Sequence, residues 1–157
     1  NYLIEEEPLG TAGCLALLPR TLTEPFLVIN GDILTRLNPS NLISFHNSQK
    51  SMATLCVRKH TLDIPFGVVE TDGFNLLSIE EKPNYNYLIN AGVYIINPSI
   101  ISIIEKHKFI DMPSLLKLTQ NQGHKVSVCP IHEYWIDVGN PDSLKEAYLN
   151  WNVSDIN

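Results

Sequence analysis

Asp32 stands where a strand pattern ends and where a ligand could bind. The residues from Phe26 to Ile29 are all apolar, and Asn30, Gly31 and Asp32 follow directly. A short apolar run of this kind is typical of a buried strand, here in a parallel sheet covered on both faces. Ligands of open α/β sheets bind just beyond the carboxyl ends of such strands. A carboxylate there can hold a divalent metal on a phosphate, although Asp also commonly caps a turn or the next helix.

A second aspartate, Asp137, lies near the other end of the chain, shortly before the pair Asn140-Pro141, which is a typical helix start. On its own, an aspartate in such a capping region is unremarkable. Beside Asp32 it would complete a magnesium site, because two carboxylates with phosphate oxygens and waters suit the octahedral ion.

Two glycine-containing segments could approach a ligand closely. Gly10 and Thr11 precede a predicted helix, where a glycine lets the backbone lie against a flat ligand and free N–H groups can donate to it. The pattern is neither a Walker loop nor a dinucleotide fingerprint, and a plain loop into a helix explains it equally. Asn90 precedes the small residues Ala91 and Gly92 at the start of another strand, which leaves room for a ligand or marks an edge kink.

The segment Glu80, Glu81, Lys82 ends a predicted strand at Pro83. A lysine is a suitable point charge for a phosphate, and a carboxylate can accept hydrogen bonds from sugar hydroxyls. The alternative is a solvated hairpin end.

The other reactive side chains form no recognisable site. The five histidines have no metal-ligand spacing and no serine or cysteine partner, so we expect surface or structural roles for them. Cys14, Cys56 and Cys129 are far apart and odd in number, which predicts reduced, mostly buried thiols in a cytoplasmic protein.

Composition narrows the class of protein. With 157 residues, 44% hydrophobic and 18% charged, the chain is long and apolar enough for one globular domain. A net charge of −6 argues against general nucleic-acid binding. The longest uncharged stretch, Pro83 to Ile104, contains too many Asn and Pro residues for a membrane helix.

The pattern predicts helices alternating with strands. Asn-Pro pairs open three helices, at 38, 97 and 140, Asp111 caps a fourth, and the small apolar segment 11–18 forms a fifth. The predicted strands are 26–29, 53–58, 67–71, 76–80, 92–97 and 125–129. Asp72-Gly73 joins the third and fourth of these as a hairpin. This order indicates a mixed sheet, parallel in part, with helices on its faces.

Six motifs in this order closely resemble the sugar-1-phosphate nucleotidyltransferase family, the pyrophosphorylases that make nucleotide sugars. The resemblance extends from about Pro8 to about Tyr148. Its motifs are Leu9 to Gly13, Phe26 to Asp32, Phe66 to Glu70, Glu80 to Pro83, Asn90 to Tyr94 and Trp135 to Pro141.

The resemblance implies a Rossmann-like mixed, mainly parallel sheet flanked by helices, with an antiparallel β-hairpin insertion. It also implies a role for each candidate site residue. Asp32 and Asp137 would hold Mg²⁺, and Lys82 would meet the sugar phosphate. The other expected contacts are Gly10 and Thr11 to the nucleobase, the Gly67 backbone to the sugar, and Glu81 (or Glu80) and Asn90 to sugar hydroxyls.

The implied reaction joins a sugar-1-phosphate to a nucleoside triphosphate and releases pyrophosphate. The motif forms look most like guanylyltransferases of the mannose-1-phosphate type, with glucose-1-phosphate thymidylyl- or uridylyltransferases as the nearest alternatives. The expected partners are these two substrates, with neither nucleic acid nor membrane, in the cytoplasm; a homo-oligomer is compatible with the sequence.

The glycine-rich signature loop of the family is absent from these residues. The resemblance therefore implies that residues 1–157 are the C-terminal two-thirds of one catalytic domain, and that this piece alone has no turnover. Two other classes stay open. One is a non-catalytic relative that binds a nucleotide sugar and regulates a partner. The other is a structural fragment that self-associates through an uncovered apolar face.

Overall fold

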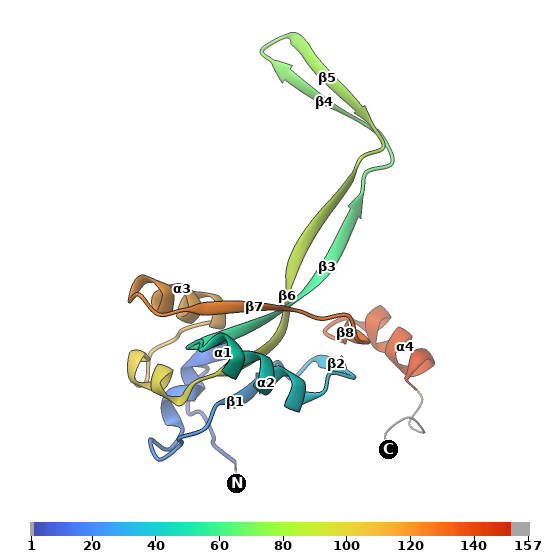
Figure 1. Cartoon of the computed structure of the whole chain (residues 1–157). Coiled ribbons are helices and arrows are strands. Elements are labelled where there is room, and N and C mark those ends of the chain that lie inside the picture. Colours follow the sequence, from blue (N-terminus) through green and yellow to red (C-terminus); the bar gives the residue numbers. More distant parts are fainter. Residues whose placement is uncertain (1, 152–157) are drawn as a thin grey trace.

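The structure is a computed structural model that describes residues 2–151. Its centre is a four-stranded sheet in the order β1-β6-β3-β7, with helices packed on it (Figure 1). These strands are β1 (Phe26–Ile29), β6 (Asn84–Ile96), β3 (Ala53–Asp63) and β7 (Val126–Pro130). β6 is antiparallel to both β1 and β3, and β7 is parallel to β3, so β1, β3 and β7 share one direction. The expected mixed α/β fold is confirmed.

Four of the helical segments, α2, η2, α3 and α4, begin where the sequence places capping residues. Their bounds are α1 (Gly10–Gly13), α2 (Pro39–Gln49), α3 (Met112–Asn121) and α4 (Pro141–Asn150), with 3₁₀ segments η1 (Cys14–Leu17) and η2 (Pro98–Ile103). Each predicted cap accepts a hydrogen bond from a backbone N–H of the first turn; these caps are Asn38, Asn97, Asp111 and Asn140. The side-chain oxygens thereby satisfy donors that the helix itself cannot use.

The inner half of β6 is buried on both faces: alternate residues of the strand point to opposite sides, and each side joins a buried cluster. Ala91, Val93 and Ile95 join a buried cluster that includes Leu42 of α2. Tyr94 and Ile96 join a second cluster on the other face, which contains buried residues of α1, η2 and α3. This two-sided core fixes the position of β6, and β1 is paired along it residue by residue.

Several local predictions need correction. The single helix expected over 11–18 is a short α-turn followed by a 3₁₀ segment, and the helix expected after Asn97 is also 3₁₀. β3 and β6 continue far beyond 53–58 and 92–97. Among the described residues β1 pairs only with β6, antiparallel, and Leu27 and Ile29 are 37% and 43% exposed, so the prediction of a strand buried on both faces is wrong.

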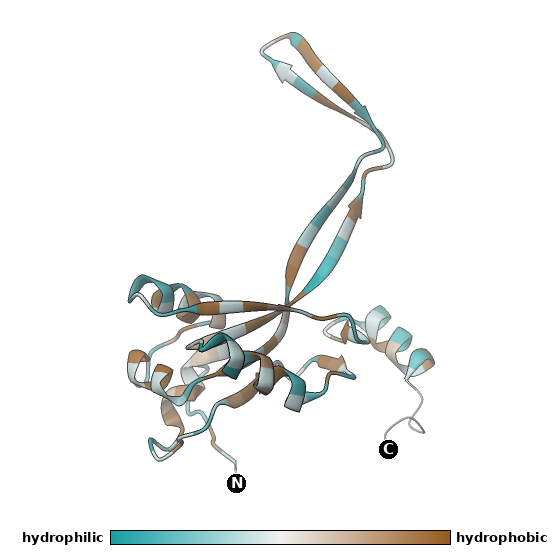
Figure 2. Ribbon diagram, viewed as in Figure 1, coloured by the Kyte–Doolittle hydropathy of each residue, from teal (hydrophilic) through white to brown (hydrophobic). Residues whose placement is uncertain are grey.

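The continuation of β3 and β6 forms an arm that leaves the body of the molecule (Figure 1). At its end lies the predicted hairpin, β4 (Gly67–Asp72) and β5 (Asn75–Glu81), with Gly73 at φ +60° in its turn. Figure 2 shows both apolar and polar residues on each strand of this hairpin, and Val69, Leu77 and Ile79 are all exposed. The hairpin is therefore amphipathic without a covering layer among the described residues.

The three cysteines are free thiols, and only Cys56 is fully buried. Of the five histidines, His46 alone is buried; its Nδ1 lies 2.8 Å from Thr54 Oγ1, which confirms a structural role for it. Among residues 2–151, no helix has both the length and the apolar character required to cross a membrane.

Because His46 is buried, we expect the free energy of unfolding to depend on pH. Burial lowers the pKa of its imidazole below the usual value, so the unfolded chain takes up a proton before the folded one does. The free energy of unfolding should therefore be unaffected by this group above about pH 6.5 and should fall as the pH drops from there through the folded-state pKa.

The replacement His46→Asn tests this, because an amide can keep the bond to Thr54 but does not titrate. Urea unfolding between pH 5 and 7.5 should show a smaller acid loss for His46→Asn than for the wild type. The exposed-residue control His124→Asn should follow the wild type. Parallel curves for all three proteins would show that His46 does not contribute to the pH dependence.

Candidate active site

A short ribbon brings the two predicted aspartates together. It consists of β2 (Ile33–Thr35) and β8 (Trp135–Asp137), two strands that the sequence pattern did not reveal. They pair antiparallel with Ile33 opposite Asp137, and the Val138 N–H donates to the Asp32 carbonyl oxygen at 2.8 Å. Asp137 thus ends a strand instead of merely preceding a helix, and it lies beside Asp32 despite the distance between them in sequence.

The two carboxylates converge beside Gly139. A Cβ atom added to Gly139 would lie 2.9 Å from Asp137 Oδ1 and 3.4 Å from Asp32 Oδ2. The Gly139 N–H donates to Asp137 Oδ1 at 2.8 Å, which fixes that carboxylate. Both aspartates are exposed, and no salt bridge joins either of them to a cationic side chain among residues 2–151. The described part of the chain holds no group of three or more His, Cys, Asp or Glu suited to a metal, so the two aspartates form a pair without a third such side chain.

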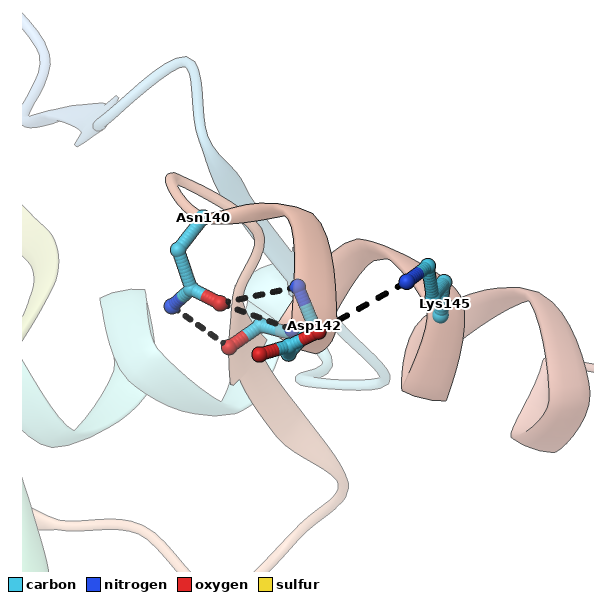
Figure 3. Close-up of polar contacts among 4 residues, drawn as sticks. Asn140, Asp142 and Lys145 are labelled. Carbon is cyan, nitrogen blue, oxygen red and sulfur yellow. Dashed lines mark hydrogen bonds and ion pairs between the residues drawn. The ribbon is translucent and has the colours of Figure 1, made fainter.

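Helix α4 anchors the segment that follows Gly139. Asn140 Oδ1 accepts from the N–H groups of Asp142 and Ser143, at 3.1 and 2.9 Å, and Asn140 Nδ2 donates to Ser143 Oγ (Figure 3). Asp142 also lies 3.7 Å from Lys145 one turn along the helix. The turn that follows Asp137 is therefore fixed by β8 on one side and by the capped helix α4 on the other.

A groove of about 480 Å³ lies next to Asp32, between α1 and the end of β1, and Thr11, Cys14 and Asn30 line it. Gly10 is needed there for packing: it has φ +79°, and a Cβ would lie 2.7 Å from the Ile110 carbonyl oxygen. Thr11 and Asp32 therefore line the same groove, and Gly10 directly precedes Thr11 in α1.

Asn90 lies on β6, close to where β1 ends. Its Nδ2 donates to Tyr94 Oη at 2.7 Å, and its Oδ1 accepts from the Gly92 N–H at 2.9 Å. Gly92 has φ +66°, and its carbonyl oxygen accepts from the Asn30 N–H at 2.9 Å. Asn90 therefore holds the irregular middle of β6 around Gly92, beside the end of β1, as well as being a candidate for ligand binding.

The remaining predicted residues lie apart from this site. Gly67, Glu80, Glu81 and Lys82 gather at the base of the β4–β5 hairpin, which Figure 1 shows well away from β2 and β8. Gly67 pairs with Glu81, and a Cβ on Gly67 would lie 3.0 Å from Glu81 Oε2. The structure thus forms two groups: the aspartate pair with its groove, and the residues at the hairpin base.

Trp135 and Gly139 are contributors that residue spacing alone did not single out. Trp135 Nε1 donates to the Ala91 carbonyl oxygen at 2.7 Å, and the Arg58 guanidinium lies 5.7 Å from the centre of the Trp135 ring. These contacts dock β8 against β6 and β3. The only sequence signal for either residue was its place in the motif 135–141.

Comparison with known proteins agrees with this geometry. The sequence model of the family described as Nucleotidyl transferase matches residues 1–152. The chain belongs to the nucleotidyl transferase family. A probable mannose-1-phosphate guanylyltransferase 1 of Oryza sativa subsp. japonica is 36% identical to this nucleotidyl transferase chain over 146 residues. The β catalytic subunit of mannose-1-phosphate guanylyltransferase from Drosophila melanogaster is 35% identical over 144 residues.

These alignments include 87% of the nucleotidyl transferase chain but only 40% and 38% of the two relatives. Among solved structures, HddC from Yersinia pseudotuberculosis superimposes with a TM-score of 0.66 at 28% identity, covering 96% of this chain and 66% of that one. HddC has also been solved in complex with GMP-PN. The expected family and fold are therefore confirmed, and the chain spans about two-fifths of the length of these curated relatives.

Asn90 provides a test of the local architecture of this nucleotidyl transferase chain. Replacing Asn90 with Ala leaves the Gly92 N–H and Tyr94 Oη without their partner, which should lower the free energy of unfolding by about 1–2 kcal/mol. Asn84→Ala, an exposed change on the same strand, should cost less than about 0.5 kcal/mol. Equal urea midpoints for the two variants would contradict the proposed role of Asn90 in holding the strand.

Proposed function

We propose that the protein carrying this chain joins a sugar-1-phosphate to a nucleoside triphosphate with release of pyrophosphate, and that the reaction is guanylyl transfer to mannose-1-phosphate or a related sugar phosphate. The observation that carries the proposal is the convergence of Asp32 Oδ2 and Asp137 Oδ1 on one point beside Gly139. The names of the relatives from Oryza sativa and Drosophila melanogaster, both mannose-1-phosphate guanylyltransferases, support the choice of base and sugar.

The donor set suits Mg²⁺. Both ligands are carboxylate oxygens, which this hard ion prefers, and a pair of them leaves positions for phosphate oxygens and waters. When bound, Mg²⁺ would supply charge neutralisation to the nucleotide phosphates. Asp32 and Asp137 would hold the ion, and the Gly139 N–H would keep the Asp137 carboxylate in place.

The reaction requires positioning more than covalent chemistry. An oxygen of the sugar-1-phosphate attacks the α-phosphorus of the nucleotide, the bond to the β-phosphate oxygen breaks, and pyrophosphate leaves. No covalent enzyme intermediate is needed. In this scheme Lys82 offsets the charge of the sugar phosphate, and Gly10 with Thr11 lies against the base beside the groove at Asp32.

The sugar contacts are assigned to Gly67, Glu80 or Glu81, and Asn90. Asn90 can serve while keeping both of its internal bonds, because its amide has a second hydrogen and its carbonyl a second lone pair. Gly67, Glu81 and Lys82 can contact the same sugar phosphate only if the base of the hairpin moves close to the aspartate pair. The proposal therefore includes a closed arrangement of the arm when substrate is bound.

The other parts of the proposal concern context. The protein acts in the cytoplasm, and residues 1–157 are the C-terminal two-thirds of one catalytic domain; a homo-oligomer is compatible with this proposal. A non-catalytic regulatory relative that binds a nucleotide sugar is the alternative class. Glucose-1-phosphate thymidylyl or uridylyl transfer is the alternative within the family.

A substrate panel tests the reaction. The complete gene product, given Mg²⁺ and each pair of nucleoside triphosphate and sugar-1-phosphate, should release pyrophosphate fastest with GTP and mannose-1-phosphate. The 157-residue chain alone should show no turnover. Pyrophosphate release fastest with dTTP or UTP and glucose-1-phosphate would assign the alternative chemistry. Nucleotide-sugar binding without any turnover would assign the regulatory class.

The aspartate pair can be tested by charge removal in the same gene product. Asp32→Asn and Asp137→Asn should each lower kcat/KM by at least about 100-fold, because each removes a metal ligand while preserving side-chain shape. Asp142→Asn is the matched control: it removes an exposed carboxylate five residues from Asp137 and should change kcat/KM less than about twofold. If Asp32→Asn or Asp137→Asn retained wild-type kcat/KM, the metal role would be wrong.

A further inference from the structure

We propose that Gly139 is a positioning residue: its missing side chain keeps open the space in which the Asp32 and Asp137 carboxylates share a divalent cation. This inference rests on the proposed function, because it concerns the metal site of that reaction. It goes further by assigning a role to a residue that is not itself a ligand.

Neither backbone conformation nor core packing requires a glycine at this position. Gly10, Gly73, Gly92 and Gly123 have positive φ angles, a region that favours glycine, whereas Gly139 does not. Gly139 is also exposed, so it fills no part of either buried cluster. An alanine here would therefore not face the strain of a left-handed φ angle.

The surroundings of Gly139 supply the reason instead. The three atoms nearest to a Cβ built there are Asp137 Oδ1 at 2.9 Å, Asp32 Oδ2 at 3.4 Å and Asp137 Cγ at 3.9 Å. All three belong to the two carboxylates. A methyl group at this point would therefore stand between the two side chains that are to hold the ion, and it would touch both of them.

The methyl group would change the site in two ways. The 2.9 Å approach is too close for a carbon, so the Asp137 carboxylate would have to rotate away and weaken its 2.8 Å bond from the Gly139 N–H. The methyl would also take space from ligands that must lie about 2.0–2.1 Å from Mg²⁺ in a near-ideal octahedron. Mg²⁺ tolerates such distortion poorly, so affinity should fall while the fold is kept.

Gly31 provides a matched control within the same site. It directly precedes Asp32, it is exposed and has no positive φ, and a Cβ there meets no atom within 4 Å. Gly31→Ala therefore adds the same methyl group beside the other aspartate without entering the space between the carboxylates.

The test measures metal binding directly, with Mn²⁺ as the probe because its electron paramagnetic resonance signal reports the free ion and because it takes the same oxygen ligands as Mg²⁺. We titrate the complete gene product with Mn²⁺ in the absence of nucleotide, as wild type and as the variants Gly139→Ala, Gly31→Ala and Asp137→Asn. Excess Mg²⁺ should then release the bound Mn²⁺. Unfolding temperatures are measured in parallel.

Gly139→Ala should raise the Mn²⁺ Kd at least about tenfold, the range seen when groups that orient metal ligands are removed. The Mn²⁺ Kd of Gly31→Ala should stay within about twofold of the wild-type value, and the unfolding temperatures of both glycine variants should match that of the wild type.

If Gly139→Ala bound Mn²⁺ with the wild-type Kd while Asp137→Asn lost affinity, the role of Gly139 would be overturned and the metal site would still hold. A fall of the Gly139→Ala unfolding temperature by more than about 5 °C would overturn it as well, by making the loss structural. If the wild-type protein showed no saturable Mn²⁺ binding, or if Asp137→Asn did not weaken that binding, both the metal site and this inference would be overturned.

Discussion

The backbone pairing of β2 with β8 is the interaction on which the rest of the site depends. These two three-residue strands join residues about a hundred positions apart, and their register places Asp137 opposite Ile33, next to Asp32. So short a ribbon is not stable by itself. It is held by side chains and backbone at its ends: the Thr35 hydroxyl and the Arg36 N–H both donate to the Tyr134 carbonyl oxygen, and Trp135 donates to Ala91 on β6. The aspartate pair is thus tied to the two-sided core through β6.

The Asp32 and Asp137 carboxylates are neighbours without a cationic partner among the described residues. The pairing of β2 with β8 makes them adjacent, and hydrogen bonds to the backbone and the capped start of α4 fix the segment that carries Asp137. The proposed function gives this arrangement a reason, because two adjacent carboxylates can share a divalent cation. The same reasoning explains the glycine at 139, whose value lies in the space that it leaves.

Much of the fold could be predicted because it depends on local chemistry. Asn38, Asn97, Asp111 and Asn140 cap helices through contacts within a few residues, and the Asp72-Gly73 hairpin needs only its turn and two alternating strands. β2 and β8 escaped prediction because three residues carry no periodicity, and the lengths of β3 and β6 depend on pairing with each other. The family resemblance led us to expect Asp32 and Asp137 to lie together, and the structure shows them side by side; their shared hold on a metal stays a prediction. The distance of Lys82 from that pair could not be read from sequence, because it depends on the direction in which the whole arm leaves the sheet.

The exposed apolar face of the hairpin and its position far from the aspartates have the same origin, since the described residues provide no surface on which the hairpin packs.

The central claim is that Asp32 and Asp137 share one cation, and a crystal of the complete gene product soaked in MnCl₂ tests it most directly. The account predicts an anomalous difference peak beside Gly139, within about 2.0–2.3 Å of one carboxylate oxygen from each aspartate. The account would be contradicted if the Asp32 and Asp137 carboxylates lay on opposite sides of the molecule. It would also be contradicted if a crystal soaked to saturation in MnCl₂ showed no anomalous peak between them.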